Sequence, residues 1–88
     1  MTIPYNVFVD QMSDGPKPTF MISLIPSTLG DGAVGTRHYD TVEAFVDDLK
    51  KHLGYTDRAI ARFFASTDRH HTLAQMPLTN QSAAYLGW

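Results

Sequence analysis

The chain has 88 residues, a net charge of −2 and 43% hydrophobic residues, which together indicate one small globular domain over residues 1–88. It contains no cysteine, so disulfides, thiolate metal sites and cysteine nucleophiles are excluded. No apolar run approaches the roughly 18 residues of a membrane-spanning helix. No signal-peptide pattern is visible either, so we expect a cytoplasmic protein without a membrane partner.

Two β-strands are predicted at the N-terminal end of the sequence. Residues 3–10 alternate between apolar and other side chains, and residues 19–25 are mostly apolar. The turn-forming residues 13–18 between them predict an antiparallel hairpin. Apolar side chains occur on both faces of this hairpin, whereas one layer of helices covers only one face of a sheet. We therefore expect the second face to meet a protein partner, a second copy of the chain or the C-terminal segment.

Two helices are predicted in the middle of the chain. The first, over residues 41–53, begins with a capping-box pattern at Asp40 and Glu43 and ends before Gly54, which suits a left-handed C-cap. The second helix follows Thr56, a favourable N-cap residue. Both segments carry apolar side chains at helical spacing, so both are expected to pack on the sheet.

The C-terminal part of the sequence is less regular. Residues 71–78 are compatible with a strand or an extended segment, and Pro77 argues against a central strand. Residues 79–86 predict a short closing helix. The aromatic tail at 85–88 is expected to dock on the core or on a neighbouring chain, because large aromatic side chains are usually buried.

These elements predict an α+β fold. We expect a two-layer sandwich in which an antiparallel β-hairpin or small sheet is covered by two consecutive helices, with a short C-terminal helix or tail. Residues 34–39 and 71–76 are candidate further strands. The predicted core combines apolar residues of the hairpin and of both helices: Val7, Val9, Phe20, Ile22, Leu24, Val42, Phe45, Val46, Leu49, Leu53, Ile60, Phe63 and Phe64.

One glycine-rich stretch matches a known cofactor-binding pattern by its letters. Residues 30–35 have the G-x-G-x-x-G spacing of dinucleotide-binding loops. In such loops the third glycine lies within a helix, whereas the helix predicted here begins at Asp40, five residues later. The chain is also too short for two nucleotide-binding halves. We therefore interpret residues 30–35 as a connecting loop and predict no cofactor.

A histidine cluster offers the only metal-ligand or general-base chemistry in the sequence. It consists of Asp68, His70 and His71, which could bind a metal ion or activate water. Adjacent residues of a strand point to opposite faces, however, which works against His70 and His71 holding one ion. A histidine-based metal or hydrolytic site is therefore our third hypothesis, and we predict no catalytic or metal-binding residue.

Charge is distributed unevenly along the sequence. Residues 1–44 carry a net charge of −3 and residues 45–88 a net charge of +1. The two predicted helices also have the order of a helix-turn-helix motif. Our second hypothesis is therefore a nucleic-acid-binding accessory protein that uses a basic helical hairpin over residues 50–69. Its contacts would come from Lys50, Lys51, Arg58, Arg62 and Arg69.

The leading hypothesis is a small non-enzymatic interaction module. It would self-associate as a homo-oligomer, most simply a homodimer, or bind a protein partner through its N-terminal hairpin. The hypothesis rests on the apolar side chains on both faces of that hairpin and on the lack of a coherent catalytic set. The predicted interaction surface consists of Phe8, Met12, Met21, Ile25 and Trp88.

Overall fold

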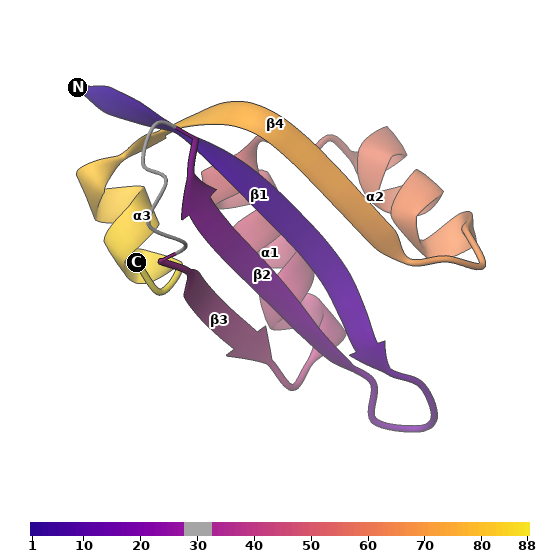
Figure 1. Cartoon of the computed structure of the whole chain (residues 1–88). Coiled ribbons are helices and arrows are strands. Elements are labelled where there is room, and N and C mark those ends of the chain that lie inside the picture. Colours follow the sequence, from indigo (N-terminus) through magenta and orange to yellow (C-terminus); the bar gives the residue numbers. More distant parts are fainter. Residues whose placement is uncertain (28–32) are drawn as a thin grey trace.

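The computed structural model describes residues 1–27 and 33–88, which form a four-stranded antiparallel sheet with three helices (Figure 1). The order of strands in the sheet is β3-β2-β1-β4, so the N-terminal hairpin supplies the two central strands. The predicted α+β fold is confirmed. The elements in chain order are β1 (Thr2–Ser13), β2 (Thr19–Pro26), β3 (Gly35–Tyr39), α1 (Val42–Leu53), α2 (Asp57–Ala65), β4 (His70–Thr79) and α3 (Asn80–Tyr85).

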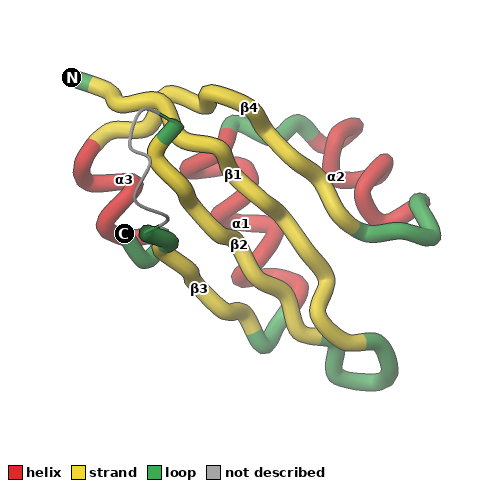
Figure 2. The backbone as a smooth tube through the Cα atoms, in the orientation of Figure 1, coloured by secondary structure: helices red, strands yellow, loops and turns green. Residues whose placement is uncertain are grey.

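The register of the hairpin places the alternating apolar residues in one layer. Val7 pairs with Leu24 and Val9 with Ile22, and all four side chains are fully buried. Helix α1 crosses behind the sheet, with α2 and α3 to either side of it (Figure 2). Side chains that alternate with this buried set point to the opposite surface of the sheet.

Residues 71–78, for which the sequence allowed a strand or an extended segment, lie within strand β4. This strand pairs with β1 at the edge of the sheet, where Pro77 removes no hydrogen bond from a neighbouring strand. A bulge interrupts the pairing near Asn6, and Gln75 there adopts a positive φ of 53°. The Asn6 side chain accepts a hydrogen bond from the Gln75 backbone N–H at 3.1 Å. The Asn6 side chain thus provides an acceptor for the Gln75 N–H, which the bulge takes out of the hydrogen-bonded pairing between β1 and β4.

The helix ends follow the predicted residues with one exception. Gly54 has the left-handed conformation expected of a C-cap, with φ of 69°, and the Thr56 side chain caps α2. The predicted cap at Asp40 is wrong. Thr41 is the N-cap of α1, and its hydroxyl accepts from the Ala44 N–H at 3.2 Å. Because β3 continues to Tyr39, two residues are needed to turn the chain into the helix.

The core is built around stacked aromatic rings. Phe20 of β2 and Phe45 of α1 lie 4.3 Å apart between ring centroids, and Phe63 of α2 contacts Phe45. Val42 is a correction to the predicted core, because it opens α1 and its side chain is 37% exposed. The structure leaves Val46, Ile60 and Phe64 only partly buried. It adds five buried residues that the predicted core omitted: Tyr5, Tyr39, Leu78, Ala83 and Leu86.

Helix α3 docks on the core, as predicted for the C-terminal tail. Ala83 and Leu86 are buried, and Gly87 lies directly against the backbone of Thr36 on β3. A Cβ atom at Gly87 would lie 1.9 Å from the Thr36 carbonyl oxygen, so only glycine fits there. None of the described helices is long and apolar enough to cross a lipid bilayer.

Candidate interaction surface on the open sheet face

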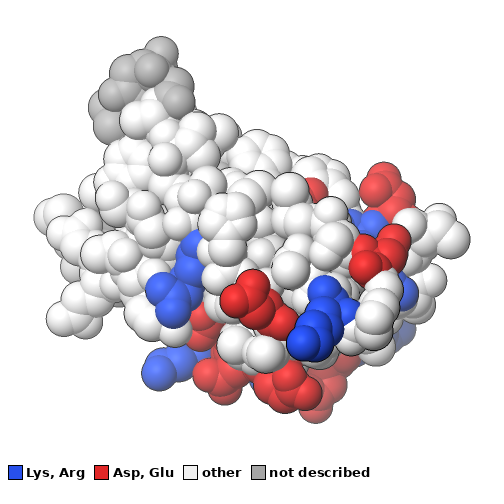
Figure 3. Space-filling view, turned by 90° about the horizontal axis from the view of Figure 1, so that it is seen from below, with Lys and Arg blue, Asp and Glu red and all other residues white. Residues whose placement is uncertain are grey.

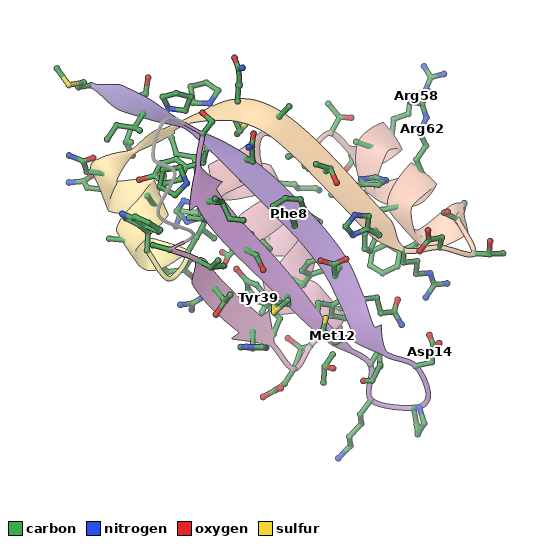
Figure 4. The ribbon with its side chains drawn as sticks, viewed as in Figure 1. Phe8, Met12, Asp14, Tyr39, Arg58 and Arg62 are labelled. Carbon is green, nitrogen blue, oxygen red and sulfur yellow. The ribbon has the colours of Figure 1, made fainter. Side chains whose placement is uncertain are left out.

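One surface of the sheet carries no helix in the part of the chain that the structure describes. We call it the open face. Figure 4 is viewed from this side, with Phe8 near its centre and α1 behind the sheet. The strand pairings and the alternation of side chains assign to the open face Asn6, Phe8, Asp10, Met21, Ser23, Ile25, Thr36, His38, His70 and Thr72.

The centre of the open face is apolar, and polar side chains surround it. Phe8 of β1 is partly exposed, and its cross-strand neighbours are Ser23 on β2 and Thr72 on β4. Met21 and Ile25 of β2 are partly exposed on the same face. These side chains shield one another across the strands, but no described helix covers them. The result is a surface with an apolar centre.

Met12 lies at the hairpin end of β1, where a bulge interrupts the pairing with β2. Its side chain is 53% exposed, which is unusual for a large apolar residue. Four of the five predicted interaction residues thus lie on the two strands of the hairpin: Phe8, Met12, Met21 and Ile25. Trp88, the fifth, is separate from them, because it follows α3 and its ring packs edge-on against Tyr5, a residue of the helix-covered face.

An acid–base pair borders the apolar centre. The Asp10 carboxylate is in hydrogen-bond contact with Nδ1 of His70 on the neighbouring strand, and the imidazole stacks on the Phe8 ring. Nε2 of His70 lies 3.2 Å from the Thr72 hydroxyl. The hydrogen bond and the negative charge of Asp10 raise the pKa of His70. Asp10 is therefore the hydrogen-bond partner of this histidine.

His71 belongs to a different environment from His70. Its Nδ1 lies 2.9 Å from the Tyr55 hydroxyl, and its ring packs edge-on against Phe63 beneath the sheet. Burial raises the pKa of Tyr55 to about 12, so its hydroxyl is protonated at neutral pH. The two histidines thus diverge, as expected for adjacent strand residues, and no group of three or more metal-ligating side chains occurs among the described residues.

The basic residues predicted to contact nucleic acid do not converge on one groove. Lys50 pairs with Asp57 at 2.6 Å, and this contact lowers the pKa of Asp57. Arg69 donates to the Gln11 side chain at 2.7 Å. Lys51 is exposed on α1, and Figure 4 shows Arg58 and Arg62 projecting from α2 away from the sheet. In Figure 3, basic and acidic side chains lie interspersed rather than segregated.

A shallow pocket lies between the hairpin and the turn that connects α2 to β4. Its volume is about 490 Å³, and its walls include Asp10, Asp14, Phe64, Arg69 and His70. The polar groups in it already contact one another, since Arg69 bonds to Gln11 and Asp10 contacts His70. This pocket therefore presents few free groups for orienting a ligand.

The sequence analysis missed a buried carboxylate at the other end of the sheet. Asp48 of α1 is 4% exposed, and its Oδ2 accepts from the Tyr39 hydroxyl at 2.6 Å. The Tyr85 hydroxyl and the Arg37 guanidinium also face it, at 3.3 and 3.6 Å. Burial and the neighbouring carboxylate raise the pKa of Tyr39, which keeps this donor protonated. The sequence did contain a sign that Asp48 is buried, because Asp48 follows Phe45 by three residues and therefore lies on the apolar side of α1.

The first half of the glycine-rich stretch over residues 30–35 lies outside the described residues. Gly35, the last residue of the stretch, opens β3 and is buried against the backbone of Trp88. Comparisons with models of known protein families, with curated proteins and with solved structures find no match to this chain.

Proposed function

We propose that this protein is a non-enzymatic interaction module that self-associates through the open face of its sheet. The observation that carries the proposal is the distribution of described helices, which cover one face of the sheet and leave Phe8, Met21 and Ile25 at the surface of the other. A contiguous apolar patch ringed by polar groups is typical of protein interfaces.

A second copy of the chain fits this surface better than a charged partner does. In a two-fold contact each patch meets itself, so a patch with a net charge would repel its copy. The described residues of the open face include no Lys or Arg, and the Asp10 carboxylate is paired with His70 within the same face. Two sheets pack well face to face, at a spacing of about 10 Å.

The size of the open face indicates a weak dimer. Four strands about 4.8 Å apart and roughly eight residues long, at about 3.3 Å per residue, give a footprint on the order of 500 Å². Stable complexes typically bury about 800 Å² on each partner. We therefore expect a dissociation constant in the micromolar range and a dimer that separates on dilution.

Nucleic acid is a less favoured occupant of the open face. Binding to a phosphate backbone requires Lys or Arg side chains, which the described residues of this face lack. The exposed cations Arg58 and Arg62 lie on α2 and project away from the sheet (Figure 4). A nucleic-acid complex of the open face would therefore lack the electrostatic attraction that supplies most of the affinity in such complexes.

The test is the molar mass in solution, measured by light scattering on a sizing column over about 5 to 500 µM protein. The proposal predicts a mass that rises with concentration from 9.8 kDa towards twice that value. Phe8→Glu places a charge at the centre of each patch and should keep the protein monomeric throughout the range. Phe8→Thr removes the ring without adding charge, and it suits a strand if the first variant does not fold.

Val42→Glu is the matched control. Val42 is an exposed apolar residue at the start of α1, away from the open face, so its replacement should leave the mass profile unchanged. A wild-type protein that stays at 9.8 kDa over the full range would contradict the proposal. Equal dimerisation of wild type and the Phe8 variants would contradict the assignment to this face. Retention of a random oligonucleotide that fades steeply with salt would favour nucleic acid instead.

A further inference from the structure

A second exposed surface lies on the side of the sheet that carries the helices. It consists of Arg37 on β3 together with Tyr85 and Trp88 at the end of α3, and we call it the Arg37 corner. Arg37 N–H groups donate to the Tyr85 carbonyl and hydroxyl, and the backbone of Trp88 lies over Gly35, two residues before Arg37. Arg37 and Tyr85 thus contact each other directly, and Trp88 adjoins them through its backbone at Gly35, while its ring packs against Tyr5.

The aromatic rings of the Arg37 corner remain partly open to solvent. The exposed fraction is 42% for Tyr85 and 43% for Trp88, although α3 is docked through Ala83 and Leu86. Figure 3 shows the end of the molecule that carries α3 as largely free of charged side chains. Tryptophan, tyrosine and arginine are the residue types most enriched among those that dominate binding energy in protein interfaces.

These side chains are also held in place before any partner arrives. The Arg37 guanidinium lies 4.2 Å from the centre of the Tyr85 ring, and His52 of α1 stacks on the same ring at 4.5 Å. Asp48 anchors the arrangement from below, facing both Arg37 and the Tyr85 hydroxyl. A surface whose rotamers are already fixed loses less entropy when it binds.

The charge of the Arg37 corner indicates the chemistry of its partner. The counter-ion Asp48 is buried, whereas the Arg37 side chain is 40% exposed. Its two terminal nitrogens carry four N–H bonds, of which two are engaged within the described residues, both with Tyr85. A guanidinium with outward donors matches a carboxylate, which can accept two parallel hydrogen bonds from it.

We propose that the Arg37 corner binds an acidic peptide segment of another protein. A carboxylate of the segment meets the outward N–H groups of Arg37, and an adjacent apolar side chain packs on the exposed rings of Tyr85 and Trp88. This contact is independent of the open face, because Arg37 points to the helix-covered side of the sheet. One molecule can therefore pair with its copy and hold a peptide at the same time.

The test begins with selection of a random peptide library displayed on phage against the immobilised full chain. We expect the enriched sequences to combine Asp or Glu with a neighbouring aromatic or aliphatic residue. A synthetic copy of the leading sequence is then titrated into the protein. Trp88 is the only tryptophan of the chain, so its fluorescence should shift to shorter wavelength as the ring is covered. Binding should weaken several-fold between about 0.05 and 0.5 M NaCl.

Three variants decide the assignment. Arg37→Gln and Trp88→Ala should each weaken binding of the selected peptide at least about tenfold by calorimetry. Arg58→Gln, an exposed arginine on α2, is the matched control and should leave the affinity unchanged. If Arg37→Gln fails to fold, the result with Trp88→Ala tests the proposal by itself, because Trp88 is not among the residues that contact Asp48. Enrichment of neutral or basic peptides, no enrichment, or equal binding by Trp88→Ala would overturn the proposal.

Discussion

Two carboxylates of this protein meet basic partners in opposite environments. Asp48 lies beneath the sheet, 4% exposed, with two tyrosine hydroxyls and the Arg37 guanidinium around it. Asp10 lies at the surface of the open face, in contact with the imidazole of His70. The first site joins β3, α1 and α3, of which β3 and α1 are consecutive in the chain, whereas the second joins two strands that are neighbours in the sheet but 60 positions apart in the sequence.

The two sites differ in what it costs to break their contacts. A buried carboxylate that loses its partners is left without water to replace them, so breaking its contacts is costly. A surface pair exchanges its partner for solvent at little cost, and its effect depends on pH and salt. We therefore expect large effects on stability at Asp48, and small effects that depend on pH at the pair of Asp10 and His70.

The largest effect is expected from Asp48→Ala. The change removes the acceptor of the Tyr39 and Tyr85 hydroxyls and leaves Arg37 without its buried counter-ion. The free energy of unfolding should fall by about 3 kcal/mol. Urea unfolding followed by circular dichroism measures it. Asp47→Ala, an exposed neighbour on the same helix, should change the stability by less than about 0.5 kcal/mol. Similar losses in the two variants would contradict the structural role of Asp48.

A smaller loss is expected from Tyr39→Phe. The variant keeps the ring but removes the hydroxyl that donates to Asp48 at 2.6 Å in a buried site. One carboxylate oxygen then loses its shortest hydrogen bond, which should reduce the unfolding free energy by about 2 kcal/mol. The same urea titration measures the loss. A variant as stable as wild type would show that Asp48 does not depend on this donor.

Tyr85→Phe should reduce stability less than Tyr39→Phe does. The Tyr85 hydroxyl is 3.3 Å from Asp48, and its ring is partly exposed, so water can replace the lost donor. We expect a loss of about 1 kcal/mol. Thermal unfolding of both variants side by side gives the ranking. A larger loss from Tyr85→Phe would reverse the order that the two distances and exposures predict.

The smallest effect is expected at the surface pair. Since Asp10 raises the pKa of His70, the pair stabilises the fold below the ordinary histidine value of about 6.5 and loses this contribution as pH rises through the raised pKa. Solvent screening limits it to less than about 1 kcal/mol.

Proton NMR titration of the His70 ring should show its pKa falling towards the ordinary range in Asp10→Asn. The stability difference between this variant and wild type should be larger at acidic than at alkaline pH. An unchanged His70 titration would refute the pairing. His71, which contacts Tyr55 instead of Asp10, is the internal reference in the same spectra.

Local patterns in the sequence were sufficient for most of the fold. The hairpin follows from period-two alternation and a turn-rich connection, and α2 follows from the cap at Thr56. Gly54 marked the end of α1 because a left-handed residue closes a helix there. Local patterns could not distinguish Asp40 from Thr41 as the N-cap, since that choice depends on where β3 ends.

The candidate site was predicted only in part. Alternation placed Phe8 opposite Val7 and Val9 on the first strand, and Met21 and Ile25 opposite Ile22 on the second, because side-chain direction in a strand has a strict period. The register that brings the two sets to one face is given by the structure. The contact between Asp10 and His70, 60 positions apart, could not be predicted, because it depends on the register between β1 and β4. The C-terminal tail was expected to dock, and Leu86 is buried, but Trp88 remains 43% exposed and lies apart from the open face with which the sequence analysis grouped it.

The sequence by itself determined which segments become strands and helices and which side of each is apolar, because these properties depend on neighbours a few positions away. Only the tertiary structure decided which polar groups meet. Asp48, Tyr39, Arg37 and Tyr85 come from three elements, and their contacts exist because β3, α1 and α3 pack together. The open face has the same origin, since it is the side of the sheet on which no described helix packs.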